Sequence, residues 1–446
     1  MVTRVKPRYS KNNTSLAKKV FIESLGCSKN LVKSEAIASL LRANGYVFCA
    51  SYENSTDAEI IIVNTCGFIK SARLEAESVI NKFKASWIAG KKVVVVGCYA
   101  SRFSKILKKK FPLCTIIENM DPVIGIKQAL ELENSSPMNR IVSTNAYAYL
   151  EIATGCSKSC SYCLIPSIQG SFTSKSKKII LTEIQNLCEQ NNLKEIVLIA
   201  QDTASYGLDL HPRDSLLSLV TSLSTIKSID WIRIMYLYPI LSVDTLQKIL
   251  STEKVIPYLD MPLQHFSPKI LQLMNRPENI ELYMDKLFQL KSKHPELTLR
   301  STFMVGFPGE KEEDFEILKR GLLKYPFDRA GFFSYSREKE TTADSLPEQV
   351  HSSTKKKRLQ EAYSIQETIS REQNQKYIGK TLPVLLESFE PTKQIALGRT
   401  YREAPEVDPV VTITGNPFRL KRKIGSIQTM KITQATAYEI QGSLQE

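Results

Sequence analysis

Apolar runs alternate with amphipathic segments through the first third of the chain. Strands are predicted at residues 20–25, 58–63 and 93–96, and helices at residues 31–44 and 71–89. The first helix carries Ile37, Leu40 and Leu41 at a spacing that places them on one face. Strands alternating with helices are typical of a parallel sheet covered on both sides. We therefore predict a small doubly wound domain at residues 20–138, preceded by a basic tail at residues 1–19.

A longer series of the same kind follows. Its strands are predicted at residues 147–153, 195–200, 231–237, 256–261, 298–305 and 330–335, and its helices at residues 182–190, 216–223, 243–250, 280–293 and 312–323. Polar or Gly/Pro-rich residues stand just after each strand. Such units predict an open (βα)6 partial TIM barrel, with its site at the carboxyl ends of the strands. We assign this domain to residues 140–374.

The pattern changes again in residues 375–446. Short β-rich runs at residues 381–386, 410–414 and 427–433 are separated by Gly, Pro and Asn. Runs of this kind favour a small antiparallel β-barrel of the OB-like type, a fold that often binds nucleic acid. The whole chain is thus predicted to be an α/β protein with three domains.

Three cysteines, Cys156, Cys160 and Cys163, lie within eight residues after a predicted strand and a glycine. A loop with this spacing can hold three corners of a 4Fe–4S cube and leave the fourth iron open to a ligand. The alternative is a zinc site, but structural zinc takes four ligands, and His211 is far away in sequence. The ligand number favours the iron–sulfur cluster.

Three further cysteines each follow a predicted strand of the first domain. They are Cys27, Cys66 and Cys98. Because parallel strands end at one edge of a sheet, these thiols are expected to converge there, and helix N-termini after Cys66 and Cys27 favour thiolates. The alternative is that a small residue simply suits a turn. Convergence favours a second cluster, again with one open iron.

Composition limits the class of protein. The chain has 446 residues and only nine cysteines, which is too few for a secreted disulfide scaffold and suits metal ligands in the cytoplasm. No apolar run reaches the roughly 18 residues that span a bilayer, so no membrane partner is expected. The net charge of +14 suggests a nucleic-acid or ribosomal partner. However, residues 374–446 carry 10 Lys and Arg against 7 Asp and Glu, so the basic excess lies elsewhere.

Several motifs resemble the methylthiotransferases, radical S-adenosylmethionine (SAM) enzymes. They are GCSKN at residues 26–30, VNTCGFI at 63–69, GC at 97–98, CSKSCSYC at 156–163, LDMPLQH at 259–265 and RTYREAPEVD at 399–408. The resemblance runs from about residue 20 to the C-terminus. It implies a radical SAM barrel, a C-terminal TRAM domain and two 4Fe–4S clusters, held by Cys156, Cys160 and Cys163 and by the three N-terminal cysteines.

Within the family, CSKN at 27–30, QDT at 201–203 and APEVD at 404–408 resemble the branch that modifies the β-carbon of an aspartate in the twelfth small-subunit ribosomal protein. That branch implies the ribosomal protein and an electron donor as partners. An aspartate β-C–H is too weakly acidic for a side-chain base, so radical chemistry is needed. Residues expected near SAM are Tyr162, Gln201, Asp202, Gln264, Gly306 and Glu310.

Two alternatives are kept. The first is the same enzyme class acting on a tRNA adenosine, which the net charge favours. Acidic residues Glu403, Glu406 and Asp408 in the C-terminal barrel favour a basic protein partner instead. The second alternative is a non-enzymatic zinc- or RNA-binding module, which the two cysteine sets disfavour.

Overall fold

The structure is a computed structural model that describes residues 2–4, 18–49, 55, 57–133, 140–144 and 146–445. Its contacts divide the chain into two compact units. The first comprises residues 1–144, 149–157 and 164–191, and the second comprises residues 145–148, 158–163 and 192–446. Most of the predicted basic tail and the segment 134–139 lie outside the described residues. The predicted domain boundaries stay a prediction.

A mostly parallel sheet forms the core of the first unit. Its strands are β1 (Val2–Arg4), β2 (Lys19–Leu25), β3 (Val47–Phe48), β4 (Ile60–Thr65), β5 (Lys92–Gly97) and β6 (Thr115–Ile116). They follow the order β1-β2-β4-β5-β6, and β3 pairs with β2. Only β1 runs antiparallel to its neighbour. The predicted doubly wound fold is confirmed, whereas β1 was not predicted.

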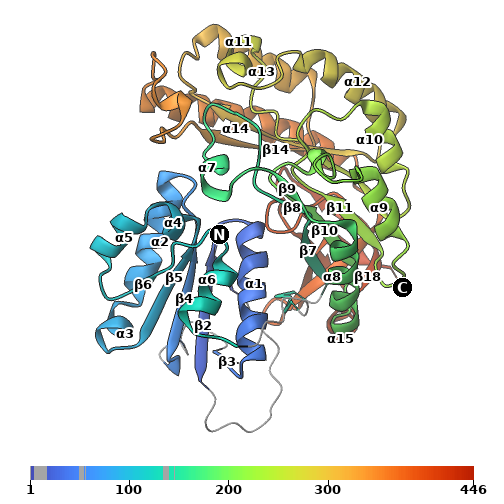
Figure 1. Cartoon of the computed structure of the whole chain (residues 1–446). Helices are drawn as coiled ribbons and strands as arrows, with labels where there is room; N and C mark the ends of the chain where they lie inside the picture. The colour runs from blue at the N-terminus through green and yellow to red at the C-terminus, as the bar shows by residue number, and fades with distance from the viewer. Residues whose placement is uncertain are drawn as a thin grey trace. The chain divides into compact units, whose positions relative to one another are not determined.

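Helices cover both faces of this sheet, with α1 and α6 on one face and α2, α3 and α5 on the other (Figure 1). The helices of the unit are α1 (Ser28–Ala43), α2 (Lys70–Lys82), α3 (Lys84–Ile88), α4 (Cys98–Arg102), α5 (Ser104–Lys110), α6 (Pro122–Ala129), α7 (Ile165–Gln169) and α8 (Lys177–Gln190). The single helix predicted at 71–89 is interrupted at Phe83, whose ring packs 5.9 Å from that of Phe21 in the core. Short strands β8 (Ala153–Thr154) and β9 (Thr173–Ser174) pair antiparallel.

An open sheet forms the core of the second unit, although residues 149–151 of its edge strand are counted with the first unit. Its order is β14-β13-β12-β11-β10-β7, and the strands are β7 (Tyr147–Glu151), β10 (Glu195–Ile199), β11 (Trp231–Ile234), β12 (Val255–Asp260), β13 (Thr298–Val305) and β14 (Arg329–Ser334). Strands β10 to β14 are parallel. The helices are α9 (Leu216–Ser224), α10 (Val243–Leu250), α11 (Pro268–Leu273), α12 (Ile280–Lys293), α13 (Glu312–Lys324) and α14 (Ser352–Gln375). The predicted (βα)6 partial barrel is confirmed.

The C-terminal part of this unit is a closed barrel of order β15-β16-β17-β19-β18. Its elements are β15 (Thr381–Glu390), β16 (Ile395–Thr400), β17 (Val411–Thr414), α15 (Pro417–Arg422), β18 (Ile427–Ala435) and β19 (Ile440–Leu444). The predicted barrel is confirmed, but it is not wholly antiparallel, because β17 and β19 run parallel. Parallel neighbours need a crossover connection, which α15 and β18 provide.

A buried ion network joins this barrel to the strands of the open sheet. The Glu195 carboxylate accepts from Arg233 Nε and from Arg399 Nη2, each at 2.6 Å. Arg399 belongs to β16, and the exposed fraction of these side chains is at most 1%. Their attraction in a low-dielectric interior offsets the cost of dehydrating them only while every partner is present.

Among the described residues, helices long and apolar enough to cross a membrane are absent.

Candidate functional site

Strands β2, β4 and β5 are neighbours, and a cysteine follows the end of each. Cys27 is the residue before α1, Cys66 follows β4, and Cys98 opens α4. Burial, followed by the charges of the Cys27 and Cys66 thiolates, raises the pKa of Cys98 to about 12. Burial also raises the pKa of Cys66, although the backbone N–H of Phe68 opposes the shift. Cys27 therefore lies close enough to Cys66 and Cys98 to disfavour their ionisation, and a cation such as iron would relieve this cost.

Asn30 ties the three cysteine-bearing loops together. Its Nδ2 donates to Leu25 O at 2.8 Å and to Thr65 O at 3.2 Å, just before Cys27 and Cys66. Its Oδ1 lies 3.9 Å from Cys98 Sγ, which donates to it. The side chain is only 5% exposed. One amide thus sets the spacing between loops that are far apart in sequence.

We expect Asn30→Ala to lower the free energy of unfolding by about 2–3 kcal/mol, because two buried carbonyls lose their donor. The matched control is Asn44→Ala, which removes an amide that donates to Leu40 O at the end of α1. That change should cost about 1 kcal/mol or less. Urea unfolding of the two variants beside the parent measures the difference. Equal destabilisation by both changes would contradict the tying role of Asn30.

Two glycines allow these loops to approach closely. Gly26 has φ +95°, and a Cβ there would lie 2.7 Å from Cys66 Cβ. Gly97 has φ +90°, and a Cβ there would lie 2.3 Å from Asn64 Oδ1. Both positions combine a left-handed backbone with a contact that any side chain would violate. The glycines before Cys27 and Cys98 are thus required by the packing of the loops.

A pocket of about 180 Å³ adjoins Cys98 within the first unit. Lys29 and Lys33 of α1 line it, together with Thr154 and Gln169, which precede and follow the cysteine triplet in sequence. Gln169 Nε2 donates to Cys98 Sγ at 3.7 Å. Sequence reasoning missed Gln169, because it lies 71 residues from its partner and has no motif of its own.

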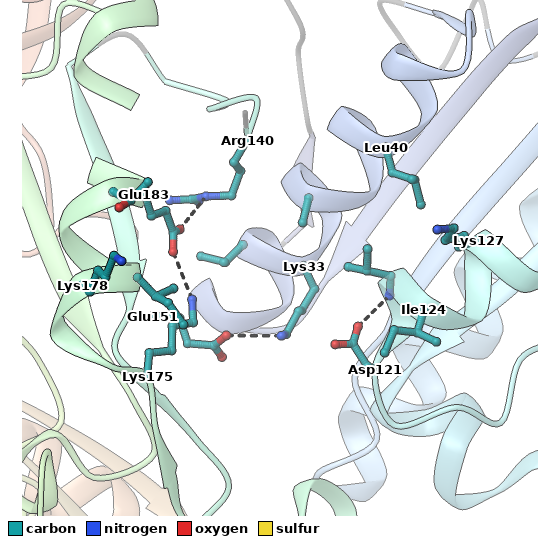
Figure 2. A pocket seen from close by; sticks show the side chains of 15 residues that line it. Lys33, Leu40, Asp121, Ile124, Lys127, Arg140, Glu151, Lys175, Lys178 and Glu183 are labelled. Atoms are coloured by element: carbon teal, nitrogen blue, oxygen red, sulfur yellow. Dashed lines mark hydrogen bonds and ion pairs between the residues drawn. The ribbon is translucent and has the colours of Figure 1, made fainter. Parts of the chain in front are cut away.

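A larger pocket of about 800 Å³ shares Lys33, Asp121 and Glu151 with the smaller one. Figure 2 shows that several of the charged side chains lining it pair with one another. Lys33 Nζ lies 3.3 Å from Glu151, and Glu183 lies 3.1 Å from Lys175 and 3.3 Å from Arg140. The paired charges and the apolar side chains of α1 and α6 give this pocket a wall that suits binding better than proton transfer.

The cysteine triplet spans the two units. Cys156 belongs to the first, where its N–H donates to Gly170 O at 3.1 Å. Cys160 and Cys163 belong to the second, joined by a turn in which Cys163 N donates to Cys160 O at 3.0 Å. In the described part of the chain, no three His, Cys, Asp or Glu side chains are placed to hold a single metal ion.

Cys160 has a buried cation beside it. Arg276 Nη1 lies 3.9 Å from Cys160 Sγ, and the guanidinium stacks 4.3 Å from the Tyr238 ring centroid. Burial alone would lower the pKa of Arg276, but its interactions with the Tyr162 and Cys160 side chains outweigh burial and raise it. The guanidinium is thus a buried hydrogen-bond donor to the Cys160 sulfur. Sequence reasoning missed Arg276, which lies 116 residues from Cys160.

The carboxylates expected near SAM are engaged within their own turns. Asp202 accepts from Ala204 N at 3.0 Å and Ser205 Oγ at 2.6 Å, and Lys158 lies 3.6 Å away. Contact between Asp202 and SAM stays a prediction. Gln201, from the same strand end, is half-buried.

Glu310 accepts from Gly306 N at 2.8 Å and Arg358 Nη1 at 2.8 Å. It therefore holds the turn that opens α13. Gly306 has φ +71°, and a Cβ there would lie 2.3 Å from Lys355 Cγ. These two residues support the wall of the barrel, and their contact with SAM also stays a prediction.

Three further residues of the barrel have different surroundings, and they are Gln264, Tyr162 and His265. Gln264 has φ +76°, and its buried Oε1 has no hydrogen-bond partner in the described part of the chain. Tyr162 packs edge-on to Phe307 at 6.4 Å. His265 is fully buried, and its Nδ1 accepts from Ser267 N at 2.8 Å. The histidine is thus a buried hydrogen-bonding residue of the barrel wall.

Comparison with known families assigns each part of this fold. Residues 19–118 match the uncharacterized protein family UPF0004, residues 150–320 the radical SAM superfamily, and residues 378–444 the TRAM domain. The structure of the radical SAM methyltransferase TsrM from Kitasatospora setae, with cobalamin and a 4Fe–4S cluster bound, is similar in fold. Its TM-score is 0.52 at 11% identity, covering 74% of this chain and 77% of that one. The fold and the thiols define a SAM-dependent radical enzyme.

Full-length relatives narrow the assignment. The ribosomal protein uS12 methylthiotransferase RimO of Clostridioides difficile is 38% identical over 445 residues, covering 96% of this chain and 98% of that protein. The protein of that name from Thermus thermophilus is 37% identical over 442 residues, covering 95% and 99%. This chain belongs to the RimO family of radical SAM methylthiotransferases, which uses SAM and 4Fe–4S clusters.

The structure contradicts the inference from the acidic residues of the C-terminal barrel. The sequence predicts that the acids Glu403, Glu406 and Asp408 suit a basic protein partner. Glu403 is instead 1% exposed and lies 2.9 Å from Arg329, while the Asp408 side chain is 4% exposed and lies 3.4 Å from Arg300. Their charges are neutralised inside the protein, so the relatives, and not these acids, favour the ribosomal branch over tRNA.

Proposed function

We propose that this enzyme adds a methylthio group to the β-carbon of an aspartate in ribosomal protein uS12, on the small ribosomal subunit in the cytoplasm. The observation that carries the proposal is the near-complete alignment with relatives named for that reaction, at 37–38% identity. An external electron donor is required, because reductive cleavage of SAM consumes an electron.

We further propose that the six cysteines form two ligand sets. Cys27, Cys66 and Cys98 fit an auxiliary cluster, since their loops converge on Asn30 and their thiols interact electrostatically. Cys156, Cys160 and Cys163 fit the SAM-cleaving cluster by spacing and by the cation beside Cys160. When bound, SAM and the clusters supply hydrogen-atom abstraction from an unactivated carbon and the sulfur that is attached.

The remaining work falls to side chains of this chain. Arg276 and Gln169 each donate to a cysteine sulfur, and such hydrogen bonds tune the potential of an iron–sulfur site. Tyr162 of the triplet loop packs against an apolar cluster that includes Phe307, Met304 and Tyr335, which limits the access of water on that side of the loop. Exclusion of water protects a reactive radical from side reactions.

A direct test compares substrates. The reconstituted enzyme is incubated with SAM and reductant, and with either small ribosomal subunits or tRNA. Mass spectrometry should show the mass of a methylthio group added to one aspartate of uS12 and an unchanged tRNA. A gain confined to tRNA would refute the proposed substrate, while a gain on neither would refute the proposed reaction under these conditions.

A further inference from the structure

The larger pocket of the first unit takes no part in the reaction described so far. It is a groove of about 800 Å³, and all fifteen residues that line it belong to that unit. Most of them come from helices α1, α6 and α8, and we call it the three-helix groove. A volume of this size is typical of sites that bind a ligand or the side chains of a partner.

Apolar side chains line much of the groove. Val32, Ala36 and Leu40 follow one another at intervals of four residues along α1, so they form a ridge of about 12 Å on one face of that helix. Ile124 of α6 and Ile179 of α8 line the groove as well, with 49% and 57% of their surfaces exposed. Large aliphatic side chains left half exposed beside an apolar ridge indicate a surface that another molecule covers.

The charges of the groove are not balanced. Its lining contains five Lys and Arg against three Asp and Glu. The acids are all engaged, because Asp121 accepts from a backbone N–H at the start of α6 and the two glutamates pair with cations of the lining. Lys127 and Lys178 form neither ion pairs nor side-chain hydrogen bonds with the described residues, and they lie on opposite sides of the groove (Figure 2). Two unpaired cations therefore remain for an anionic partner.

The lining also distinguishes between classes of anionic partner. Among the described residues that line the groove there is no aromatic ring, so the bases of a nucleic acid would have no stacking surface. A small molecule is normally enclosed by its site, whereas both isoleucines remain half exposed. A helix with an apolar stripe matches the ridge on α1, because ridges of side chains four residues apart on two helices interdigitate. The chemistry of the groove thus favours a protein helix that carries acidic residues beside its apolar stripe.

We propose that the three-helix groove binds an acidic amphipathic helix of a partner protein, with the partner's apolar side chains on the ridge of α1 and its carboxylates at Lys127 and Lys178. The groove shares three residues, Lys33 among them, with the smaller pocket that adjoins Cys98. A partner bound there therefore lies next to the pocket beside that thiol. The inference goes beyond the proposed function and does not depend on it.

The test uses the full-length, cluster-loaded enzyme and two fluorescein-labelled peptides of about eighteen residues. The first peptide consists of Leu, Ala and Glu with every leucine on one face of the helix, and the second has the same composition with the leucines spread around the helix. Fluorescence anisotropy gives the Kd of each. We expect the first peptide to bind about tenfold more tightly than the second, because only the first can place an apolar stripe on the ridge.

Two changes in the groove test its apolar and its charged contacts separately. Ile179→Asp should weaken binding of the first peptide about tenfold, because a charge replaces an apolar contact. Lys127→Glu combined with Lys178→Glu should weaken binding by a similar factor and should strengthen binding of a peptide in which lysine replaces every glutamate. Loss of folding would weaken binding of both peptides, so it could not produce this inverted preference.

Matched controls lie on α5, whose residues do not line the groove. Ile106→Asp changes a 54% exposed isoleucine, and Lys105→Glu combined with Lys109→Glu reverses two charges. Neither control should change the Kd by more than about twofold. Equal binding of the two peptides, equal losses in the controls, or an unchanged preference after charge reversal would overturn the proposal.

A competition experiment addresses the small-molecule alternative. Binding of dodecanoate to the groove without binding of the first peptide would overturn the proposal and indicate a site for a small amphipathic anion. Binding is measured without turnover, so failure of the uS12 assay would leave this result standing.

Discussion

Cys66→Ala should abolish methylthio transfer while leaving SAM cleavage in place, whereas Cys160→Ala should abolish both. The reason is the proposed division of the thiols into two sets, in which each substitution would remove one of three ligands from one cluster. The iron content of the anaerobically reconstituted proteins should fall from about eight atoms per chain in the parent to about four in each variant. SAM cleavage is measured as the 5′-deoxyadenosine that chromatography detects. Methylthio transfer is measured by mass spectrometry of the ribosomal protein.

Cys188→Ala is the control for this comparison. Cys188 is a half-buried residue of α8 that belongs to neither proposed set. Its replacement should leave iron content, cleavage and transfer within about twofold of the parent. Equal loss of cleavage in Cys66→Ala and Cys160→Ala would contradict the division of labour between the two sets, and stoichiometric zinc in place of iron would remove the basis for both.

Glu195→Gln should lower the free energy of unfolding by about 3–5 kcal/mol at pH 7, the largest stability change that we expect from a single substitution here. The carboxylate is fully buried between Arg233 and Arg399, so its neutralisation leaves the buried Arg233 without its paired carboxylate and Arg399 with Glu387 alone. Chemical denaturation followed by tryptophan fluorescence is a suitable measurement, because Trp231 lies on the neighbouring strand β11.

The pH dependence of this effect has a definite sign. Burial alone would raise the pKa of Glu195, but the charges of Arg399 and Arg233 outweigh burial and lower it. A lowered pKa contributes stability above the unfolded value of about 4.3, which is lost as the pH falls through the folded value. The gap between Glu195→Gln and the parent should therefore be full at pH 7 and narrow below about pH 4. Glu189→Gln, at an exposed position of α8, should show no such gap.

Most elements could be predicted because their pattern is local. The helix over 280–293 and the strand over 298–305 agree with α12 and β13 at both ends, since apolar spacing depends on residues three, four or two positions apart. Prediction failed where a distant contact intervened. The helix expected at 71–89 is interrupted at Phe83, because the Phe83 ring packs against Phe21 of the distant strand β2.

The candidate site divides in the same way. The positions of Cys27, Cys66 and Cys98 after strand ends implied convergence, because parallel strands share an edge. The roles of Asn30, Gln169 and Arg276 were not predictable, since each depends on a partner on another element. The inference from Glu403 and Asp408 to a basic partner was wrong, because the sequence gives the charge of a residue but does not show whether an arginine neutralises it in the fold.

The sequence by itself determined the order of strands and helices, the spacing of the six thiols and the class of chemistry that they favour. Only the tertiary structure decided that one amide spaces three loops, that β17 and β19 run parallel, and that Glu403 and Asp408 are buried. The physical reason is range. Backbone preference and hydrophobic periodicity act between near neighbours in the chain, whereas burial and ion pairing depend on which distant segments the completed fold brings into contact.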